Sequence, residues 1–162
     1  MKIINITKDN ANMIAPLVAE FRATLNALRN ICSKPDIAAA KEEAEDLIKR
    51  GYPAFCAVEG GTAEGYMVCR IDEPCLWVEH IYVREEFRRK GVASALFAKA
   101  EELARSMGED TVFNFVHPNN EAMISFLRSK GYTVLNMLEI RKPYKGENPA
   151  ARVQVDGNVF DY

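Results

Sequence analysis

The sequence lacks the residue clusters that metal sites and disulfide frameworks require. Its 162 residues contain four cysteines, none of them in a C-x-x-C pair, and two histidines. Structural zinc needs several such ligands at short spacing, so we expect no metal site. Three of the cysteines lie in or beside apolar, strand-like runs, which predicts free buried thiols in a reducing compartment, the cytoplasm.

Long apolar runs and an excess of one charge are also missing. The opening residues, MKIINITKDN, contain no apolar run long enough for a signal peptide or a membrane span. The 21 Lys and Arg residues are balanced by 23 Asp and Glu residues. Nucleic-acid and membrane-surface binding usually show as a strong basic excess, so we expect neither kind of partner. The length suffices for a single domain with its own core.

Hydrophobic spacing predicts an α/β fold with a mixed sheet. A strand over residues 2–7 is followed by a helix in which apolar residues recur every 3.6 positions from 14 to 28. Residues 33–51 have the start and stop signals of a second helix. The period then changes to two, in three strands with short connections that imply antiparallel neighbours: 53–61, 63–72 and 76–83.

The second half of the chain predicts a parallel crossover. A helix over about 91–107 lies between the last of these strands and an expected strand at 110–117, which is the signature of a parallel pair. A short helix, another strand and a hairpin with an Asp-Gly turn complete the mixed, mostly antiparallel sheet with flanking helices. They are expected at 120–130, 132–142 and 152–162.

The stretch VREEFRRKGVASALF, residues 83–97, places four cations before one glycine at a helix start. A helix N-terminus already carries partial positive charge and unpaired N–H groups, so added cations destabilise it unless an anion binds there. The spacing Arg88-x-x-Gly91-x-Ala93 also lets the backbone approach a ligand closely. It is neither a Walker A loop nor a Rossmann fingerprint, and it predicts a pyrophosphate site.

A second pattern, NEAMISFLRSKGY, makes the chain resemble the GNAT superfamily of acyl-CoA N-acyltransferases. The family's glycine turn is written Gln or Arg, x, x, Gly, x, Gly or Ala, and Arg88, Gly91 and Ala93 stand in those places. The family's later segment has matches at Asn120, Ile124, Phe126 and Gly131.

The resemblance implies a single-domain GNAT fold and an N-acetyltransferase domain over residues 1–142. Residues 143–162 form a C-terminal extension outside the family pattern, part of the same domain or a dimer contact. The hairpin expected there is apolar on one side, and because a lone hairpin is unstable in water we expect it to dock, contributing to a homodimer. Its apolar residues are Val153, Val155, Val159 and Phe160.

The resemblance also implies acetyl-CoA as co-substrate, with its pyrophosphate on the glycine turn and its pantetheine arm along the strand that ends at Val83. Backbone groups of Ile81 and Val83 would pair with the arm, and Asn120 would contact it from the other side. The cations of the turn would then face a polyanion. The implied cofactor-binding residues are Ile81, Tyr82, Val83, Arg88, Arg89, Lys90, Gly91, Val92, Ala93, Ser94, Asn120 and Phe126.

Glu79 is the predicted catalytic base, because an amine acceptor must lose a proton before it attacks a thioester. Strand alternation places Glu79 on the face of Ile81 and Val83, with His80 on the opposite face as a structural residue. Polyamine-type members of the family carry a glutamate at the corresponding place in E-x-x-x-V, which is similar to EHIYV here. The other interpretation is a glutamate on a partly solvated strand end.

One position departs from the family pattern. The frequent general acid of the family is a tyrosine after the Phe126 position, and Leu127 stands there.

The function that the resemblance predicts is an N-acetyltransferase acting on a primary amine, of a small molecule or a protein. The alternative is an acyl-CoA-binding sensor or pseudoenzyme with little activity. An unrelated pyrophosphate-nucleotide binder would require the second pattern to be accidental.

The sequence does not name the acceptor or the acyl chain. In the resembled family the acceptor approaches between the first two helices and the later strands. The second expected helix carries acids that suit a cationic substrate, or that form an ordinary solvated face. They are Glu42, Glu43, Glu45 and Asp46.

Overall fold

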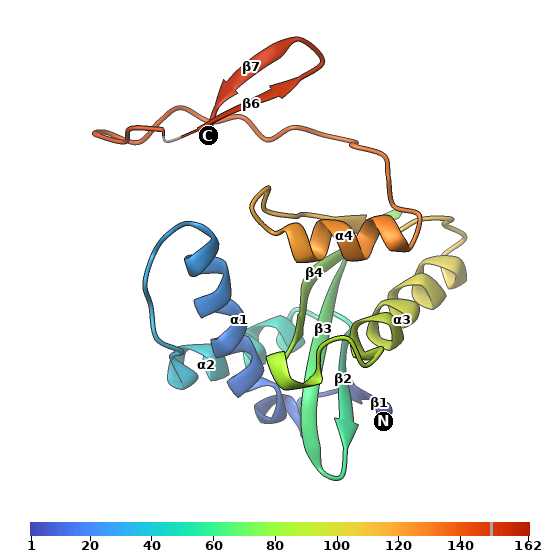
Figure 1. Cartoon of the computed structure of the whole chain (residues 1–162). Helices are drawn as coiled ribbons and strands as arrows, with labels where there is room; N and C mark the ends of the chain where they lie inside the picture. Colours follow the sequence, from blue (N-terminus) through green and yellow to red (C-terminus); the bar gives the residue numbers. More distant parts are fainter. Residues whose placement is uncertain (150) are drawn as a thin grey trace. The chain divides into compact units, whose positions relative to one another are not determined.

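A five-stranded sheet in the order β1-β2-β3-β4-β5 is the centre of the fold (Figure 1). The structure, a computed structural model, describes residues 1–149 and 151–162. Strands β1 to β4 are antiparallel to their neighbours, and β4 and β5 are parallel. The mixed, mostly antiparallel α/β fold is thus confirmed. The strands are β1 (Lys2–Ile6), β2 (Ala54–Glu59), β3 (Thr62–Asp72), β4 (Cys75–Val83) and β5 (Phe113–Asn114).

Helices α1 and α2 cover one face of this sheet, and α3 covers the other (Figure 1). Pro16 lies in the first turn of α1, where its missing N–H costs no helical hydrogen bond. The side chain of Asp36 caps α2 by accepting a hydrogen bond from Ala39 N–H at 3.0 Å. The helices are α1 (Ala15–Leu28), α2 (Ile37–Lys49), α3 (Val92–Ser106) and α4 (Glu121–Ser129), with short 3₁₀ turns at Ala11–Met13 and Glu85–Phe87.

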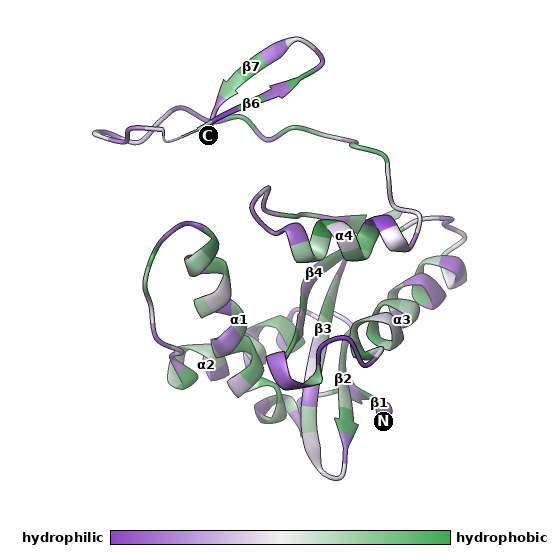
Figure 2. Cartoon of the chain, in the orientation of Figure 1, coloured by the Kyte–Doolittle hydropathy of each residue, from purple (hydrophilic) through white to green (hydrophobic). Residues whose placement is uncertain are grey.

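The helices are amphipathic, with hydrophobic and hydrophilic residues alternating along their ribbons (Figure 2). In α3 the buried residues recur at helical spacing: Val92, Leu96, Phe97, Ala100 and Ala104. On the other face, Leu17 and Val18 of α1 and Ala44 of α2 are fully buried in one core with Tyr66 and Val68 of β3. This packing holds the start of α3 beside the end of β4.

The chain divides into two compact units, Met1–Ser125 and Phe126–Tyr162. The second unit contains the predicted hairpin, β6 (Arg152–Val155) and β7 (Asn158–Asp161). Its turn residues Asp156 and Gly157 both have positive φ, +45° and +82°, as a type I′ turn requires.

The predicted apolar side of the hairpin is wrong at one position. Val153 pairs with Phe160, and these two share a face with Val155. Val159 pairs with Gln154, so it lies on the opposite face. The register between the two strands sets the side on which Val159 lies, and the sequence pattern alone does not give that register.

The strand predicted at 132–142 is also wrong, and the strand predicted at 110–117 is reduced to Phe113–Asn114. In the part of the chain that the structure describes, no strand pairs with residues 132–142. An alternating sequence becomes a strand only when a neighbour supplies the hydrogen bonds. The apolar side chains of this segment are exposed, among them Val134, Leu135, Met137 and Ile140.

Candidate functional site

The turn before α3 presents backbone N–H donors that no carbonyl of the described residues accepts. Gly91 is the N-cap residue, with φ +83°, and no side chain caps the helix. The first hydrogen bond of the helix runs from Ala95 N–H to Gly91 O at 3.0 Å. The N–H groups from Gly91 to Ser94 therefore precede the helical ladder and are directed out of the helix start. Such a cluster of amides, with the helix dipole behind it, binds anions.

The cations before this turn take different places. Arg88 Nε donates a hydrogen bond to Val83 O at 3.0 Å, and its guanidinium lies over the Tyr82 ring at 5.8 Å. Arg88 therefore ties the turn to the end of β4. The side chains of Arg89 and Lys90 are exposed, so their charge is available to an anion at the turn.

Strands β4 and β5 separate before β4 reaches its end at Val83. The parallel pairing consists of Trp77 with Phe113 and Val78 with Asn114. β4 continues for five more residues to Val83, paired with β3 on one side. Among the described residues, no strand pairs with the other edge of β4 beyond Val78. A free edge of this kind can bind an extended, amide-containing ligand.

The point of separation also holds an unsatisfied polar atom. Asn114 Nδ2 donates to Val112 O at 3.0 Å. The Asn114 Oδ1 atom is buried and has no hydrogen-bond partner within the described chain. Buried acceptors without a partner are rare in folded proteins, and a bound molecule is one way in which such an atom is satisfied.

A β-bulge places Glu79 outside the regular ladder. Val68 pairs with His80 and Cys69 pairs with Val78, so Glu79 has no partner residue on β3. Glu79 is exposed, and its Oε2 atom accepts a hydrogen bond from Arg70 Nε at 3.2 Å. Arg70 also binds Asp72 at 2.6 Å.

The bulge overturns the prediction that Glu79 and His80 face opposite sides. Arg22 of α1 contacts the His80 ring, with Nη2 3.2 Å from Nε2. The pKa of Arg22 is raised chiefly by its hydrogen bond to Glu43, and the charge of Glu79 adds to the effect. His80 pairs with Val68, and Glu79 binds Arg70, which lies two residues further along β3 and therefore on the same face. The extra residue of the bulge interrupts the alternation of β4 and puts Glu79 and His80 on one side of the sheet.

His80 belongs to a buried hydrogen-bonded chain. Its ring is 4% exposed, packs on Phe21, and has Nδ1 3.1 Å from the Tyr66 hydroxyl. Burial, together with the nearby charge of Arg22, lowers the pKa of His80 to about 4, so the ring is neutral at pH 7. Arginine can only donate, so Nε2 accepts and Nδ1–H donates to Tyr66. Arg22 in turn donates to the carboxylate of Glu43.

An aromatic group that the sequence reasoning missed lies beside Glu79. Trp77 stacks on Phe115 with ring centroids 4.5 Å apart and an interplanar angle of 13°. Phe113 lies 5.0 Å from the same ring, and the Arg70 guanidinium lies over it at 5.6 Å. We call Trp77, Phe113 and Phe115 the aromatic platform. The alternation F-x-F could have signalled it only if the pairing of β5 with β4 had been known.

Asn120, Phe126 and Leu127 lie on or next to α4. Asn120 Oδ1 accepts a hydrogen bond from Met123 N–H at 3.1 Å, so this side chain caps the helix. Phe126 belongs to the second unit, where Lys130 Nζ lies over its ring at 5.9 Å. Leu127, at the position of the family's tyrosine, is buried. It has no proton to donate.

Three of the four acids of α2 are paired with cations of this chain. Glu43 binds Arg22, and Asp46 binds Arg50 at 2.7 Å. Glu45 lies 4.0 Å from Lys41. The acidic face predicted for a cationic substrate is therefore largely neutralised by the protein itself.

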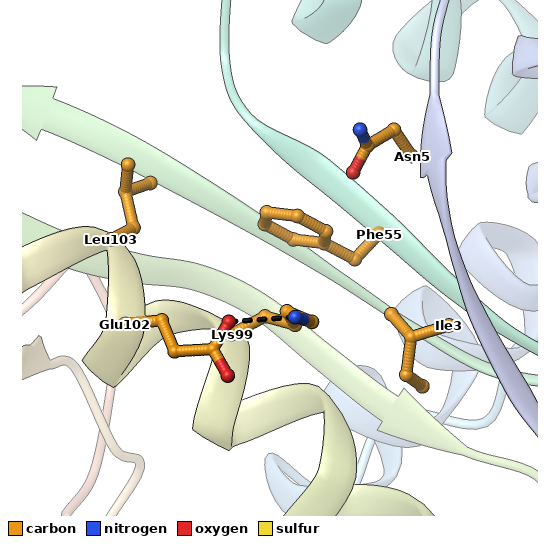
Figure 3. Close-up of a pocket in the computed structure, with 6 residues that line it drawn as sticks. All are labelled: Ile3, Asn5, Phe55, Lys99, Glu102 and Leu103. Atoms are coloured by element: carbon orange, nitrogen blue, oxygen red, sulfur yellow. Dashed lines mark hydrogen bonds and ion pairs between the residues drawn. The ribbon is translucent and has the colours of Figure 1, made fainter. Parts of the chain in front are cut away.

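A separate groove of about 490 Å³ lies between α3 and strands β1 and β2 (Figure 3). It contains the ion pair between Lys99 and Glu102, at 2.6 Å. None of the predicted site residues lines it; its lining residues are Ile3, Asn5, Phe55, Lys99, Glu102 and Leu103.

The described residues also lack the features of a metal site and of a membrane span. Within residues 1–149 and 151–162, no group of three or more His, Cys, Asp and Glu side chains is arranged to hold a metal ion. No described helix combines the length and apolarity needed to cross a membrane.

Comparison with known proteins gives one family. The sequence model of the Acetyltransferase (GNAT) family matches residues 19–132. A thialysine N-epsilon-acetyltransferase from Caenorhabditis elegans is 29% identical over 112 residues, which cover 66% of this chain and 67% of the relative.

Solved structures share the fold at low identity. A probable acetyltransferase has a TM-score of 0.72 and 19% identity, and the match covers 91% of this chain and 100% of that chain. Aminoglycoside N-acetyltransferase AAC(6')-Iy in complex with CoA has a TM-score of 0.65 and 18% identity, with coverage of 88% and 99%.

Proposed function

Since this chain belongs to the acetyltransferase (GNAT) family, we propose that it transfers an acetyl group from acetyl-CoA to a primary amine. The observation that carries the proposal is the adjacency of two features. Unpaired amides at the start of α3 suit a pyrophosphate, and the free edge of β4 suits an extended arm with amide groups. Both lie in one unit and are tied together by Arg88.

In this proposal the phosphates bind the backbone amides from Arg89 to Ser94, with Arg88, Arg89 and Lys90 supplying positive charge. The arm pairs with backbone groups of Ile81 to Val83. Asn120, in the same unit, is the family-analogous contact, with the amide nitrogen that its capping role leaves available.

The bound thioester supplies an activated acyl carbon, and the chain supplies the groups around it. Glu79 takes a proton from the ammonium of the acceptor, so that the free amine can form the new C–N bond as the C–S bond breaks. A strand N–H near Ile81 donates to the developing oxyanion. The nitrogen must lose a second proton as the amide forms. Because Leu127 cannot donate, the departing thiolate takes up that proton through water, or leaves unprotonated while the proton passes to water; a thiol pKa near 8.5 permits this.

Two measurements test the proposal. Calorimetric titration with acetyl-CoA reports binding, and release of free thiol in the presence of amines and peptides reports transfer. Binding without thiol release from any acceptor would favour the sensor alternative. That alternative is not favoured at present, because the family and its named relatives are acetyltransferases.

A further inference from the structure

We propose that the acceptor is a monoamine whose body is flat and apolar, and that the aromatic platform binds this body while Glu79 receives the amine. This inference rests on the proposed function. It concerns residues 70–115 of the first unit and names a substrate class that the matched relatives do not.

The platform is a usable apolar surface. Phe115 is stacked on Trp77 yet 61% exposed, so one side of the stack remains in contact with water. Phe115 follows the end of β5, and a contiguous exposed apolar patch of this kind marks an interaction site. A flat apolar group covers the patch best, because aromatic rings pair in offset or edge-to-face contact.

The platform and the carboxylate are at the right separation for one small molecule. Arg70 contacts both, with its Nε 3.2 Å from Glu79 Oε2 and its Cζ 5.6 Å from the Trp77 ring centre. The Glu79 carboxylate and the Trp77 ring are therefore within about 10 Å of each other, and the Phe115 ring centre lies 4.5 Å from that of Trp77. An ammonium on a two- or three-atom tether reaches across this gap, with a hydrogen bond at one end and ring contact at the other.

The local charge fits one ammonium group. One guanidinium, Arg70, and two carboxylates, Asp72 and Glu79, leave a single negative charge uncompensated. A polycation would need further acids, and three of the four acids of α2 are already paired within the protein, all except Glu42. The structure thus favours a monoamine over a polyamine.

Trp77 is the single tryptophan of the sequence, so the intrinsic tryptophan fluorescence of the full chain reports on the platform alone. Titration with 2-phenylethylamine should shift or quench the Trp77 emission, whereas spermidine at equal concentration should not. In the thiol-release assay with acetyl-CoA, kcat/KM for 2-phenylethylamine should exceed that for spermidine and lysine by at least about 10-fold.

The variant Phe115→Ala should raise KM for 2-phenylethylamine about 5- to 10-fold and leave spermidine unchanged. Its matched control is Tyr144→Ala, which removes another exposed aromatic ring and should change neither. Both positions are exposed, so folding should survive.

The outcomes separate this inference from the proposed function. Thiol release that prefers spermidine or lysine, or that Phe115→Ala lowers equally for all amines, overturns the inference and leaves the transferase. A Trp77 response to 2-phenylethylamine without thiol release from any amine supports the binding surface and overturns the transferase. No response and no release overturns both.

Discussion

Arg70 Nε donates a hydrogen bond to Glu79 Oε2 at 3.2 Å, on a bulge where Glu79 has no partner in the sheet. The proposed base is thus held by a guanidinium, and its side chain is directed by a local irregularity of β4. The bulge also puts His80 and Glu79 on the same face of the sheet. The arrangement gives the carboxylate a defined position beside the free edge of the strand.

Replacing Glu79 with Gln should slow transfer and leave acetyl-CoA binding intact. Loss of a general base typically lowers kcat about 10²- to 10⁴-fold, and the amide keeps the size of the side chain. Thiol release measures kcat, and calorimetry measures the Kd of acetyl-CoA. The control is Glu59→Gln, which neutralises another strand carboxylate, the partner of the N-terminal amine. Unchanged turnover in Glu79→Gln would remove this residue from the base role.

Replacing Gly91 with Glu should abolish acetyl-CoA binding, with an increase in Kd of about 100-fold or more, equivalent to about 2.7 kcal/mol. A Cβ at Gly91 meets nothing within 4 Å, so the protein itself has room for the side chain. The carboxylate would instead lie at the amides that the phosphates need, and its negative charge would repel the phosphates.

The strain at Gly91 needs its own control, because φ is +83° there. Gly108 has φ +86° and equally open surroundings after the end of α3. Gly108→Glu should cost similar stability, about 1–2 kcal/mol, and leave Kd nearly unchanged. Equal loss of binding in the two variants would show that strain, and not the anion site, explains the effect.

His80 should make the protein less stable as the pH falls below about 6.5. The pKa of this ring is lowered from 6.5 in the unfolded chain to about 4 in the fold, by burial and by the charge of Arg22. The unfolded state therefore binds the proton first, and stability falls between pH 6.5 and 4 by about 3 kcal/mol in total. Above pH 6.5 the His80 ring is neutral in both the folded and the unfolded state, so it contributes no pH dependence to the stability.

Urea unfolding at several pH values checks this. His80→Gln should be less stable at pH 7, because it disturbs the contacts with Tyr66 and Arg22, but it should lose most of the decline between pH 6.5 and 4. The matched control is His117→Gln, which removes the other histidine. If the loss of stability between pH 6.5 and 4 persisted in His80→Gln and disappeared in His117→Gln, it would arise from His117 and the prediction for His80 would be wrong.

Deleting residues 147–162 should convert a dimer into a monomer, because we propose that the hairpin contributes to a homodimer. Val153 and Phe160 share one face of the hairpin, and a two-stranded sheet is marginal in water without a partner. Sedimentation velocity of the full chain and of the truncated chain measures the change. A full chain that already sediments as a monomer, with an unchanged profile after truncation, would contradict the proposal.

The sequence predicted the local elements well where one signal dominated. The strands β1 to β4, the amphipathic helix α3 and the Asp156-Gly157 turn follow from period, glycine position and turn chemistry. It failed for residues 132–142, because an alternating pattern does not contain its hydrogen-bonding partner. It also failed for the sides of His80 and Val159, because each depends on the register between two strands.

The glycine turn with its cations, and the helix that it opens, were determined by the sequence alone, since backbone freedom and helix-end charge are local properties. The bulge under Glu79, its pairing with Arg70, the Trp77–Phe115 stack and the neutralisation of the α2 acids were decided by tertiary structure. Each of these joins residues from different elements, and only the packing of those elements sets the distances between them.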